Sequence, residues 1–257
     1  MRHGAHIFMN SQIDSIYSSR KAIGRSGAEF PLHSEIDPAE GAFIQQVISQ
    51  DATISRSLEV GCAYGLSSLH ICDALSSRTA PQHTIIDPFQ SSVWDGAGVR
   101  NLEEAGFRFF KLIEERSEFA LPELLKVGEE RYDFIFVDGW HTFDHTLIDC
   151  FYATRLLRTG GYLLVDDVQM APVRRVVDYL SNYPCFRIHA AVTFTDSRSV
   201  KRRMAGQLSG LLPEHTRKKM IHPALLSRLA DQRTPRMLAF KKIAKDERAW
   251  NWFPDSF

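Results

Sequence analysis

The chain has 257 residues, of which 44% are hydrophobic and 24% charged, and its 31 Lys and Arg residues equal its 31 Asp and Glu residues in number. This composition is typical of a folded globular protein and excludes a disordered or fibrous one. The balanced charge argues against a uniformly basic nucleic-acid binder and against a uniformly acidic protein. We therefore expect one globular domain over residues 1–257 and do not expect nucleic acid as a partner.

Membrane and disulfide signals are missing from the pattern. The sequence contains no apolar run of the roughly 18 residues needed to cross a bilayer, and its first residues lack a secretory apolar segment. The four cysteines lie far apart without a C-x-x-C pair, which argues against a zinc site and against a disulfide framework. We expect a soluble, cytoplasmic protein with reduced thiols.

Apolar, β-rich runs alternate with helical patterns, which is typical of βαβ units and a parallel sheet covered on both faces. The predicted strands are 57–62, 83–87, 109–114, 132–138 and 161–167. The predicted helices are 38–48, 66–75, 93–105, 119–127, 146–157 and 172–180. For the helix that begins at Pro38, Asp37 is the predicted N-cap.

Two further strands are predicted near the end of the chain, at 187–194 and 237–243, without a helical crossover between them. They complete a doubly wound, mostly parallel α/β sheet of seven strands, whose last strand is expected to be antiparallel. Residues 1–37 form an N-terminal extension, and residues 198–236 form a basic insertion before the last strand.

The first predicted strand runs through Gly61, Ala63 and Gly65 directly into a helix. Small residues let the backbone approach a ligand, and the helix N-terminus offers N–H groups to an anionic group. Asp87 ends the second strand, where doubly wound folds place an acid against a ribose. Together these features predict a nucleoside ligand. The glycines do not have the G-x-G-x-x-G spacing of a dinucleotide site, which favours a ligand without a pyrophosphate.

These motifs resemble those of the class I S-adenosylmethionine-dependent methyltransferases, most closely the small-molecule O-methyltransferases such as the catechol and macrolide-sugar enzymes. The resemblance covers roughly residues 38–183. It is carried, in the family's order, by the segment 58–67, Asp87, Ser117, the segment 137–141 and the segment 160–167.

The resemblance implies a set of cofactor contacts. Gly61, Ala63 and Gly65 would wrap the methionine part, and Ser67 would reach its carboxylate. The implied cofactor-binding residues are Glu59, Gly61, Ala63, Tyr64, Gly65, Ser67, Asp87 (ribose), Ser117 (adenine) and Asp138. Ser117 is also a candidate cap for the helix that follows it.

Three carboxylates, Asp138, Asp166 and Asp167, end the fourth and fifth strands and therefore gather at one edge of the sheet. A hard divalent cation such as Mg²⁺ relieves the repulsion between like charges and prefers carboxylate oxygens. The resembling branch binds a divalent cation at these positions. The alternative is a metal-free site in which Asp138 contacts the cofactor and Asp166 is a buried cap.

His141 lies three residues after Asp138, so it faces the same pocket. Removal of a proton from the acceptor hydroxyl requires a positioned base, and imidazole accepts a proton at neutral pH. In the resembling family this position carries the general base. Trp140 either lies against the adenine or fills core, and Trp94 shapes the pocket mouth. His145 is expected at the surface, and Asp149 either lies on a solvated helix face, which we favour, or contacts a polar substrate.

The segment 198–243 contains twelve Lys and Arg residues against two acids, Glu214 and Asp231. It is interpreted either as a solvated helical cap or as a contact for an anionic group.

We therefore expect an S-adenosylmethionine-dependent, divalent-cation-assisted O-methyltransferase acting on a hydroxyl of a small metabolite, with a homo-oligomer as a possible state. The alternatives are a nicotinamide-dependent oxidoreductase and a non-catalytic module that binds a polyanion through the basic insertion.

Overall fold

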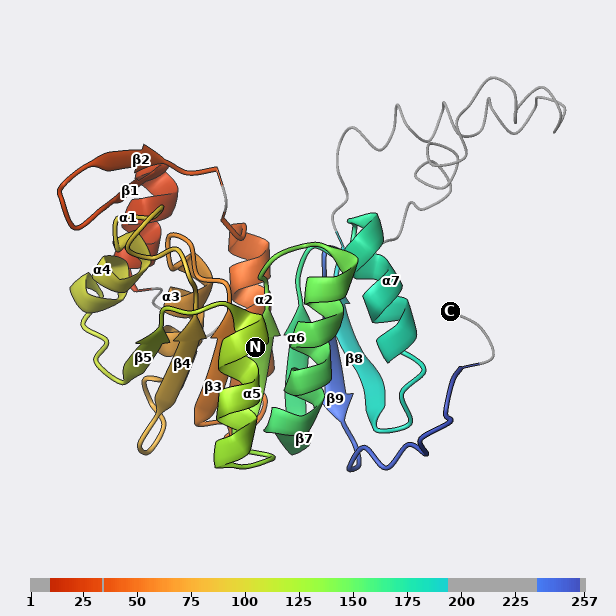
Figure 1. Ribbon diagram of the computed structural model, residues 1–257. Coiled ribbons are helices and arrows are strands. Elements are labelled where there is room, and N and C mark those ends of the chain that lie inside the picture. Colours follow the sequence, from red (N-terminus) through yellow and green to blue (C-terminus); the bar gives the residue numbers. More distant parts are fainter. Residues whose placement is uncertain (1–9, 34, 194–234, 255–257) are drawn as a thin grey trace, which may run out of the picture.

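The computed structural model of the protein describes residues 10–33, 35–193 and 235–254. In these residues a seven-stranded sheet lies between two layers of helices (Figure 1), in the strand order β5-β4-β3-β6-β7-β9-β8. The strands are β3 (Arg56–Val60), β4 (Gln82–Ile86), β5 (Phe110–Ile113), β6 (Tyr132–Val137), β7 (Leu157–Val165), β8 (Phe186–Val192) and β9 (Met237–Lys242). The predicted doubly wound α/β fold is confirmed.

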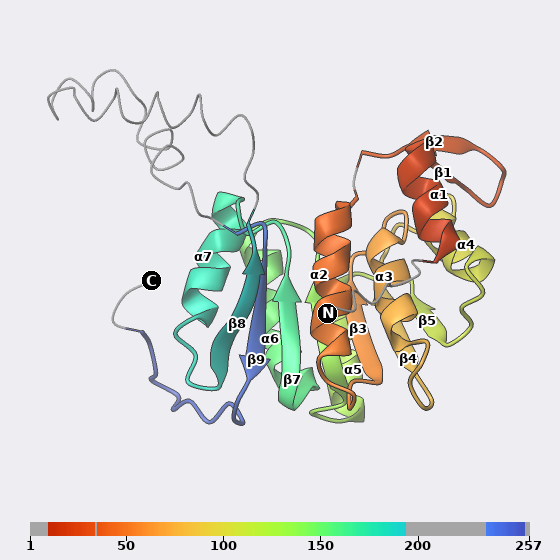
Figure 2. The ribbon, with the colours of Figure 1, turned by 180° about the vertical axis from the view of Figure 1, so that it is seen from behind.

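Helices cover both faces of the sheet, as the two opposite views show (Figures 1 and 2). One face carries α5 (Ser117–Val127), α6 (Phe143–Leu156) and α7 (Ala171–Leu180), and the other carries α2 (Pro38–Ser49) and α3 (Leu66–Leu75). Beside α3 lie α1 (Ser11–Ser19) and α4 (Ala97–Glu104). Two apolar clusters fill the space between the helices and the sheet, one on each face.

The strand pairing explains the pattern of apolar runs. The strands from β5 to β7 pair in parallel, and all six residues of β6 are buried because helices cover both of its faces. The last strand, β9, is antiparallel to both β7 and β8, which confirms its predicted direction. The carboxyl ends of β3, β4, β6 and β7 therefore meet at one edge of the sheet.

Three predicted elements begin three or four residues away from their start in the structure, and the other boundaries differ by at most two residues. The strand predicted at 161–167 begins earlier, at Leu157, and the helix predicted at 146–157 begins earlier, at Phe143. The helix predicted at 93–105 begins only at Ala97, because Gly96 stands before it in a left-handed conformation with φ of 64°. The predicted cap of α2 is present, since the Asp37 side chain accepts hydrogen bonds from the first turn.

The N-terminal extension contains structure that the sequence pattern does not predict. Helix α1 is followed by a hairpin of β1 (Lys21–Ile23) and β2 (Glu29–Pro31), and these elements pack against α3 and α4. The predicted basic insertion falls largely on residues 194–234, which lie outside the described residues, as does Phe194 at the end of a predicted strand.

Two further features concern the cysteines and membrane-spanning helices. All four cysteines are buried and unpaired, as expected for reduced structural thiols. In the described part of the chain, no helix is both long enough and apolar enough to cross a membrane.

Candidate active site

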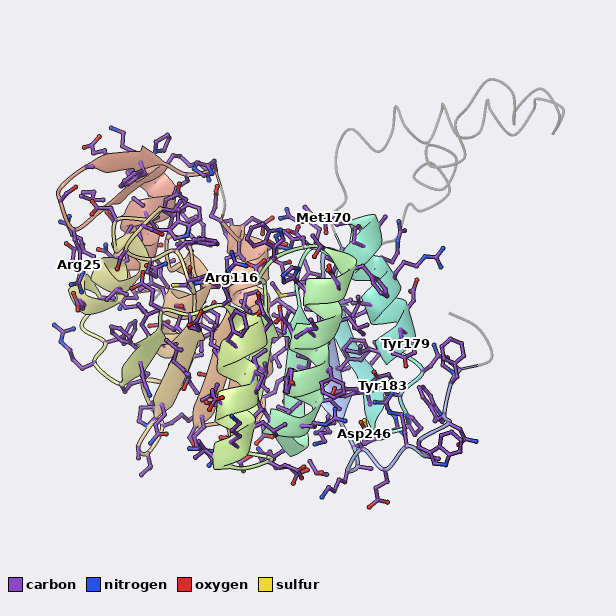
Figure 3. All side chains as sticks on the ribbon, in the orientation of Figure 1. Arg25, Arg116, Met170, Tyr179, Tyr183 and Asp246 are labelled. Atoms are coloured by element: carbon purple, nitrogen blue, oxygen red, sulfur yellow. The ribbon has the colours of Figure 1, made fainter. Side chains whose placement is uncertain are left out.

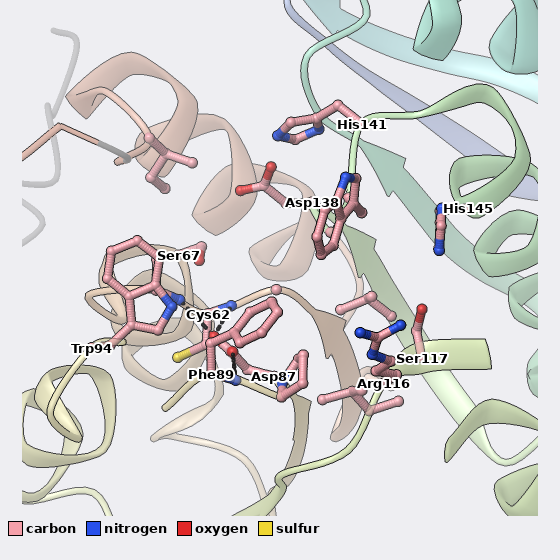
Figure 4. Close-up of a pocket in the computed structure, with 18 of the residues that line it drawn as sticks. Cys62, Ser67, Asp87, Phe89, Trp94, Arg116, Ser117, Asp138, His141 and His145 are labelled. Carbon is pink, nitrogen blue, oxygen red and sulfur yellow. Dashed lines mark hydrogen bonds between the residues drawn. The ribbon is translucent and has the colours of Figure 1, made fainter. Parts of the chain in front are cut away.

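A cavity of about 330 Å³ opens at the carboxyl ends of β3, β4 and β6 (Figure 4). Its walls come from the loop after β3, the loop after β4, the start of α5 and the loop after β6. This is the place where open α/β sheets bind ligands, and the volume is that of a small-molecule site.

The loop after β3 forms one wall and depends on its small residues. Gly61 has φ of 89°, and a Cβ atom on it would lie 2.0 Å from the carbonyl oxygen of Asp138. Ala63 and Gly65 also have positive φ, of 46° and 81°. Among the described residues no side chain caps the helix α3 that follows, so its first N–H groups are available at the cavity, beside Ser67.

Asp87 lies beneath this loop and is only 3% exposed. Its Oδ2 accepts hydrogen bonds from the backbone N–H groups of Cys62 at 3.1 Å and Ala63 at 2.9 Å, and from the Gln90 side chain at 3.0 Å. Its Oδ1 accepts from the N–H of Phe89 at 2.8 Å. The predicted ribose acid thus lines the cavity and also holds the glycine-containing loop in place (Figure 4).

Two other predicted cofactor residues lie behind the wall. Glu59 is fully buried and contacts Ser68 and, at 3.1 Å, the ring of His83. The Tyr64 hydroxyl pairs with His33 at 2.8 Å, and the Tyr64 ring packs against Trp94 at 5.0 Å. Since Trp94 lines the cavity, as predicted for the pocket mouth, Tyr64 acts by supporting it.

Aromatic side chains and Ser117 form the far end of the cavity. Trp140 is 56% exposed, which excludes a core role, and its ring lies 6.0 Å from Phe89 and 5.8 Å from His145. Ser117 is the first residue of α5, whereas Arg116 occupies the N-cap position, so Ser117 is not the cap of this helix. This end of the cavity combines flat aromatic rings with one hydroxyl group, which suits a heteroaromatic base.

At the opposite end, Asp138, His141 and Asp167 converge, with potential ligand atoms within 4.8 Å of one another. The Nε2 of His141 lies 3.2 Å from Oδ2 of Asp167. Asp167 has a left-handed backbone with φ of 53°, which is uncommon for a residue with a side chain and is found at functional turns. The predicted base and two of the three predicted metal ligands therefore lie together.

Asp166 is not part of this group of three. Its carboxyl is buried near Glu40 of α2, whose side chain is fully buried and lies 3.0 Å from the guanidinium of Arg236. Burial, followed by the neighbouring carboxylates of Glu40 and Asp167, raises the pKa of Asp166 to about 8. Sequence reasoning missed Glu40 and Arg236, because nothing in the pattern distinguishes a buried charge on an amphipathic helix from a solvated one.

The carboxyl groups of this edge outnumber the positive charges that the described residues place beside them. Burial, then the carboxylates of Asp166 and Asp167, raises the pKa of Asp138 well above its usual range. Burial also raises the pKa of Glu40 to about 7. The raised pKa values mean that these carboxyl groups have too little positive charge beside them. A hard divalent cation would supply that charge and prefers carboxylate oxygens as ligands. The residues present therefore fit Mg²⁺ or a similar ion.

Comparison with known proteins identifies the segment that builds this site. Residues 58–168 match a protein family described as methyltransferase domain. This segment is therefore similar to known methyltransferase domains. It contains the loop after β3, Asp87, Ser117, Asp138 and His141, so most of the cavity wall comes from this segment.

Several solved structures share the fold of this chain. An O-methyltransferase from Bacillus cereus in complex with SAH is 17% identical, with 74% of this chain and 87% of that chain covered and a TM-score of 0.60. A putative O-methyltransferase from Klebsiella pneumoniae is 22% identical over 74% of this chain and 86% of that chain, with a TM-score of 0.57.

An O-methyltransferase from Streptomyces achromogenes involved in tomaymycin synthesis, in complex with SAM, is 22% identical over 61% of this chain and 74% of that chain, with a TM-score of 0.53. None of the curated proteins matches the sequence. The family match agrees with the expected methyltransferase, and the solved structures share the expected fold.

Proposed function

We propose that the protein transfers the methyl group of S-adenosylmethionine to a hydroxyl oxygen of a small metabolite, with His141 as general base and a divalent cation at Asp138, Asp166 and Asp167. The observation that carries the proposal is the convergence of Asp138, His141 and Asp167 at the mouth of the cavity. The SAH and SAM complexes of the fold neighbours support the cofactor.

In this proposal different residues of the chain bind the methionine, adenine and ribose parts of the cofactor. The loop at Gly61 and Ala63, with Ser67 at the start of α3, binds the methionine end, and Ser117 lies beside the adenine. Asp87 accepts from the ribose through the remaining lone pair of its Oδ1 while it holds the loop. The sulfonium supplies the electrophilic methyl group, so the protein's task is to align the acceptor oxygen in line with it.

His141 removes the proton of the acceptor hydroxyl through Nδ1, because its Nε2 faces Asp167. Its 3.2 Å contact with Asp167 fixes the ring and stabilises the imidazolium that forms. A cation at the carboxylates would lower the pKa of the bound acceptor hydroxyl and leave coordination positions open for it. Asp138 and Asp167 lie close enough together to share such an ion, and Asp166 is the neighbouring buried carboxylate proposed as the third ligand.

A metal-free variant of the same function also has an observation in its favour, because the His141–Asp167 pair forms a base with its orienting carboxylate without any ion. The dependence of turnover on a divalent cation distinguishes the metal-dependent mechanism from the metal-free one. Methyl transfer to a panel of catechol, phenol and sugar hydroxyls is followed after chelator treatment and after readdition of Mg²⁺.

We expect chelation to abolish turnover, Mg²⁺ to restore it, and Asp138→Ala or Asp167→Ala to remove the stimulation. Turnover that resists chelation would refute the metal while leaving the dyad. His141→Ala should lower turnover by about 10²–10⁴-fold with little change in SAH affinity. His189→Ala, at a partly exposed histidine of β8 that contacts Gln50, is the matched control. Unchanged turnover in His141→Ala would exclude it as the base.

A melting temperature that S-adenosylmethionine at millimolar concentration does not raise would contradict the cofactor assignment. A cytoplasmic location and a hydroxylated small-molecule acceptor belong to the same proposal. The four buried, unpaired thiols support the location. A homo-oligomer, and an anionic contact of the basic insertion, remain predictions.

A further inference from the structure

One carboxylate that lines the cavity has no role in the function proposed above. Glu35 stands in the segment that joins β2 to α2, and its side chain is only 11% exposed. Its Oε1 lies 2.5 Å from the guanidinium of Arg20, the residue that caps the carboxyl end of α1. In the part of the chain that the structure describes, this is the one ion pair of Glu35. A carboxylate accepts several hydrogen bonds, so Oε2 is left for another partner.

The contacts on both sides of Glu35 place it at one end of the cavity. The Tyr64 hydroxyl, from the loop after β3, donates to the last carbonyl of β2 at 3.3 Å. The Tyr17 hydroxyl donates to the carbonyl of Ile36 at 3.1 Å and lies 3.3 Å from Nε2 of His70 on α3. The chain around Glu35 is thus held against the loop after β3 and against α3. This is the end of the cavity to which the proposed function assigns the methionine part of the cofactor.

Backbone carbonyls of the loop after β3 already accept hydrogen bonds from the protein. The carbonyl of Cys62 accepts from the N–H of Gly65 at 2.7 Å. The carbonyl of Ala63 accepts from the Gln90 side chain at 2.8 Å. A cationic ligand group at this end therefore finds its strongest available acceptor in the carboxylate of Glu35.

The other acidic side chains that line the cavity lie elsewhere or are already engaged. Asp87 accepts hydrogen bonds at both of its oxygens from the loops after β3 and β4. Glu118 belongs to the start of α5, beside Arg116 (Figure 3). Asp138 lies at the reaction edge with His141. Among the described lining residues, the negative charge at the methionine end is that of Glu35.

An amino acid presents a carboxylate and an ammonium group side by side. The uncapped N–H groups at the start of α3 suit the carboxylate, whereas an ammonium group has three donors and requires acceptors. We propose that Glu35 binds the α-ammonium group of the cofactor through Oε2 and thereby selects ligands with a free amino-acid end. The inference rests on the proposed function, in which S-adenosylmethionine supplies this group.

Arg20 orients the carboxylate and does not take its place in the cavity. The Arg20 side chain is 59% exposed, so water screens its charge, whereas Glu35 is shielded on the cavity side. The ion pair occupies Oε1 and holds the side chain in one direction. Loss of Arg20 alone should therefore leave the binding of an ammonium group in place.

The test compares SAH with its deaminated analogue, in which hydrogen replaces the α-ammonium group. Binding of each to the full chain is measured by calorimetry at neutral pH. The wild type should bind SAH about 10- to 100-fold more tightly, the range of a hydrogen bond between charged groups. Glu35→Gln should lower SAH affinity by a similar factor and change the affinity for the analogue by less than about threefold, because the amide keeps the shape and loses the charge.

Two control variants separate binding from a structural role. Glu29→Gln makes the same change in an exposed ion pair of β2, 2.5 Å from Nζ of Lys21, and should leave both affinities unchanged. Arg20→Gln removes the partner of Glu35 and keeps the carboxylate, so the preference for SAH should persist. If Glu35 only held its segment in place through the ion pair, Arg20→Gln and Glu35→Gln would weaken both ligands alike.

The outcomes that overturn the inference differ from the one that overturns the cofactor site. A wild type that binds SAH and the deaminated analogue equally, or a Glu35→Gln variant that keeps the full preference, overturns the inference and leaves the methyltransferase intact. Failure of the wild type to bind SAH overturns the proposed cofactor site, and the inference with it.

Discussion

Replacement of Asp87 by asparagine separates two roles of this carboxylate. If it only binds the ribose, the substitution lowers SAH affinity and leaves the free protein as stable as before. If it also holds the loop after β3, as its bonds to Cys62, Ala63, Phe89 and Gln90 indicate, the free protein loses stability as well. The side chain keeps its volume in this substitution, so cavity formation does not confuse the comparison.

The size of the loss follows from the hydrogen bonds. The amide oxygen can serve the N–H groups of Cys62 and Ala63, but each bond to a neutral acceptor is weaker by about 1 kcal/mol than a bond to a carboxylate. The amide nitrogen then faces the N–H of Phe89, which leaves a buried donor unsatisfied at about 1–3 kcal/mol. We expect a total loss of about 3 kcal/mol and a melting temperature lower by roughly 6–12 °C.

The assay is thermal and urea unfolding of the free protein, with Asp178→Asn on α7 as the control for a general Asp→Asn effect. SAH affinity is measured in parallel by calorimetry. A variant with unchanged unfolding and reduced SAH affinity would refute the loop-holding role and leave the ribose contact alone.

Three further outcomes are expected. Gly61→Ala should destabilise the protein by at least about 3 kcal/mol in urea unfolding, because a Cβ would lie 2.0 Å from the Asp138 carbonyl oxygen; a stability equal to wild type would contradict this packing. Burial raises the pKa of Asp149 to about 7, so this carboxyl binds more protons in the folded than in the unfolded protein, and its contribution should lower stability by roughly 4 kcal/mol as pH rises from about 4 to above 7. In Asp149→Asn this slope, seen in melting temperature against pH, should flatten. Arg236→Met should cost about 3–5 kcal/mol by leaving Glu40 buried without its partner, and the double change with Glu40→Met should recover most of that loss; no recovery would argue against the pair.

The sequence predicts the fold correctly where the hydrophobic periodicity and the residue types at the ends of the elements indicate the same structure. The parallel strands are continuous apolar runs, and Gly65 and Pro38 mark helix starts, so these strands, α2 and α3 follow from the local pattern. The hairpin of β1 and β2 was not accessible, since its three-residue strands are too short for a period.

Some features of the candidate site also follow from the sequence, whereas others depend on tertiary packing. Gly61, Asp87, Asp138 and His141 stand at strand ends, where parallel topology brings them to one edge whatever the side-chain details. The separation of Asp166 from Asp167 depends on the left-handed backbone at Asp167, and that is a tertiary effect. The burial of Asp149, which makes its expected place on a solvated helix face wrong, likewise depends on how α6 packs against β6 and α5.

Backbone hydrogen bonds of Arg236 tie the end of β8 to the segment before β9. The N–H of Arg236 donates to the carbonyl of Val192 at 2.8 Å, and the N–H of Val168 donates to the carbonyl of Arg236 at 2.8 Å. The guanidinium of Arg236 is tied to Asp37 and Glu40 at the reaction edge. Because loop closure costs little more as length grows, the chain between Val192 and Arg236 can change in length while this backbone pairing and the ion pairs of Arg236 persist.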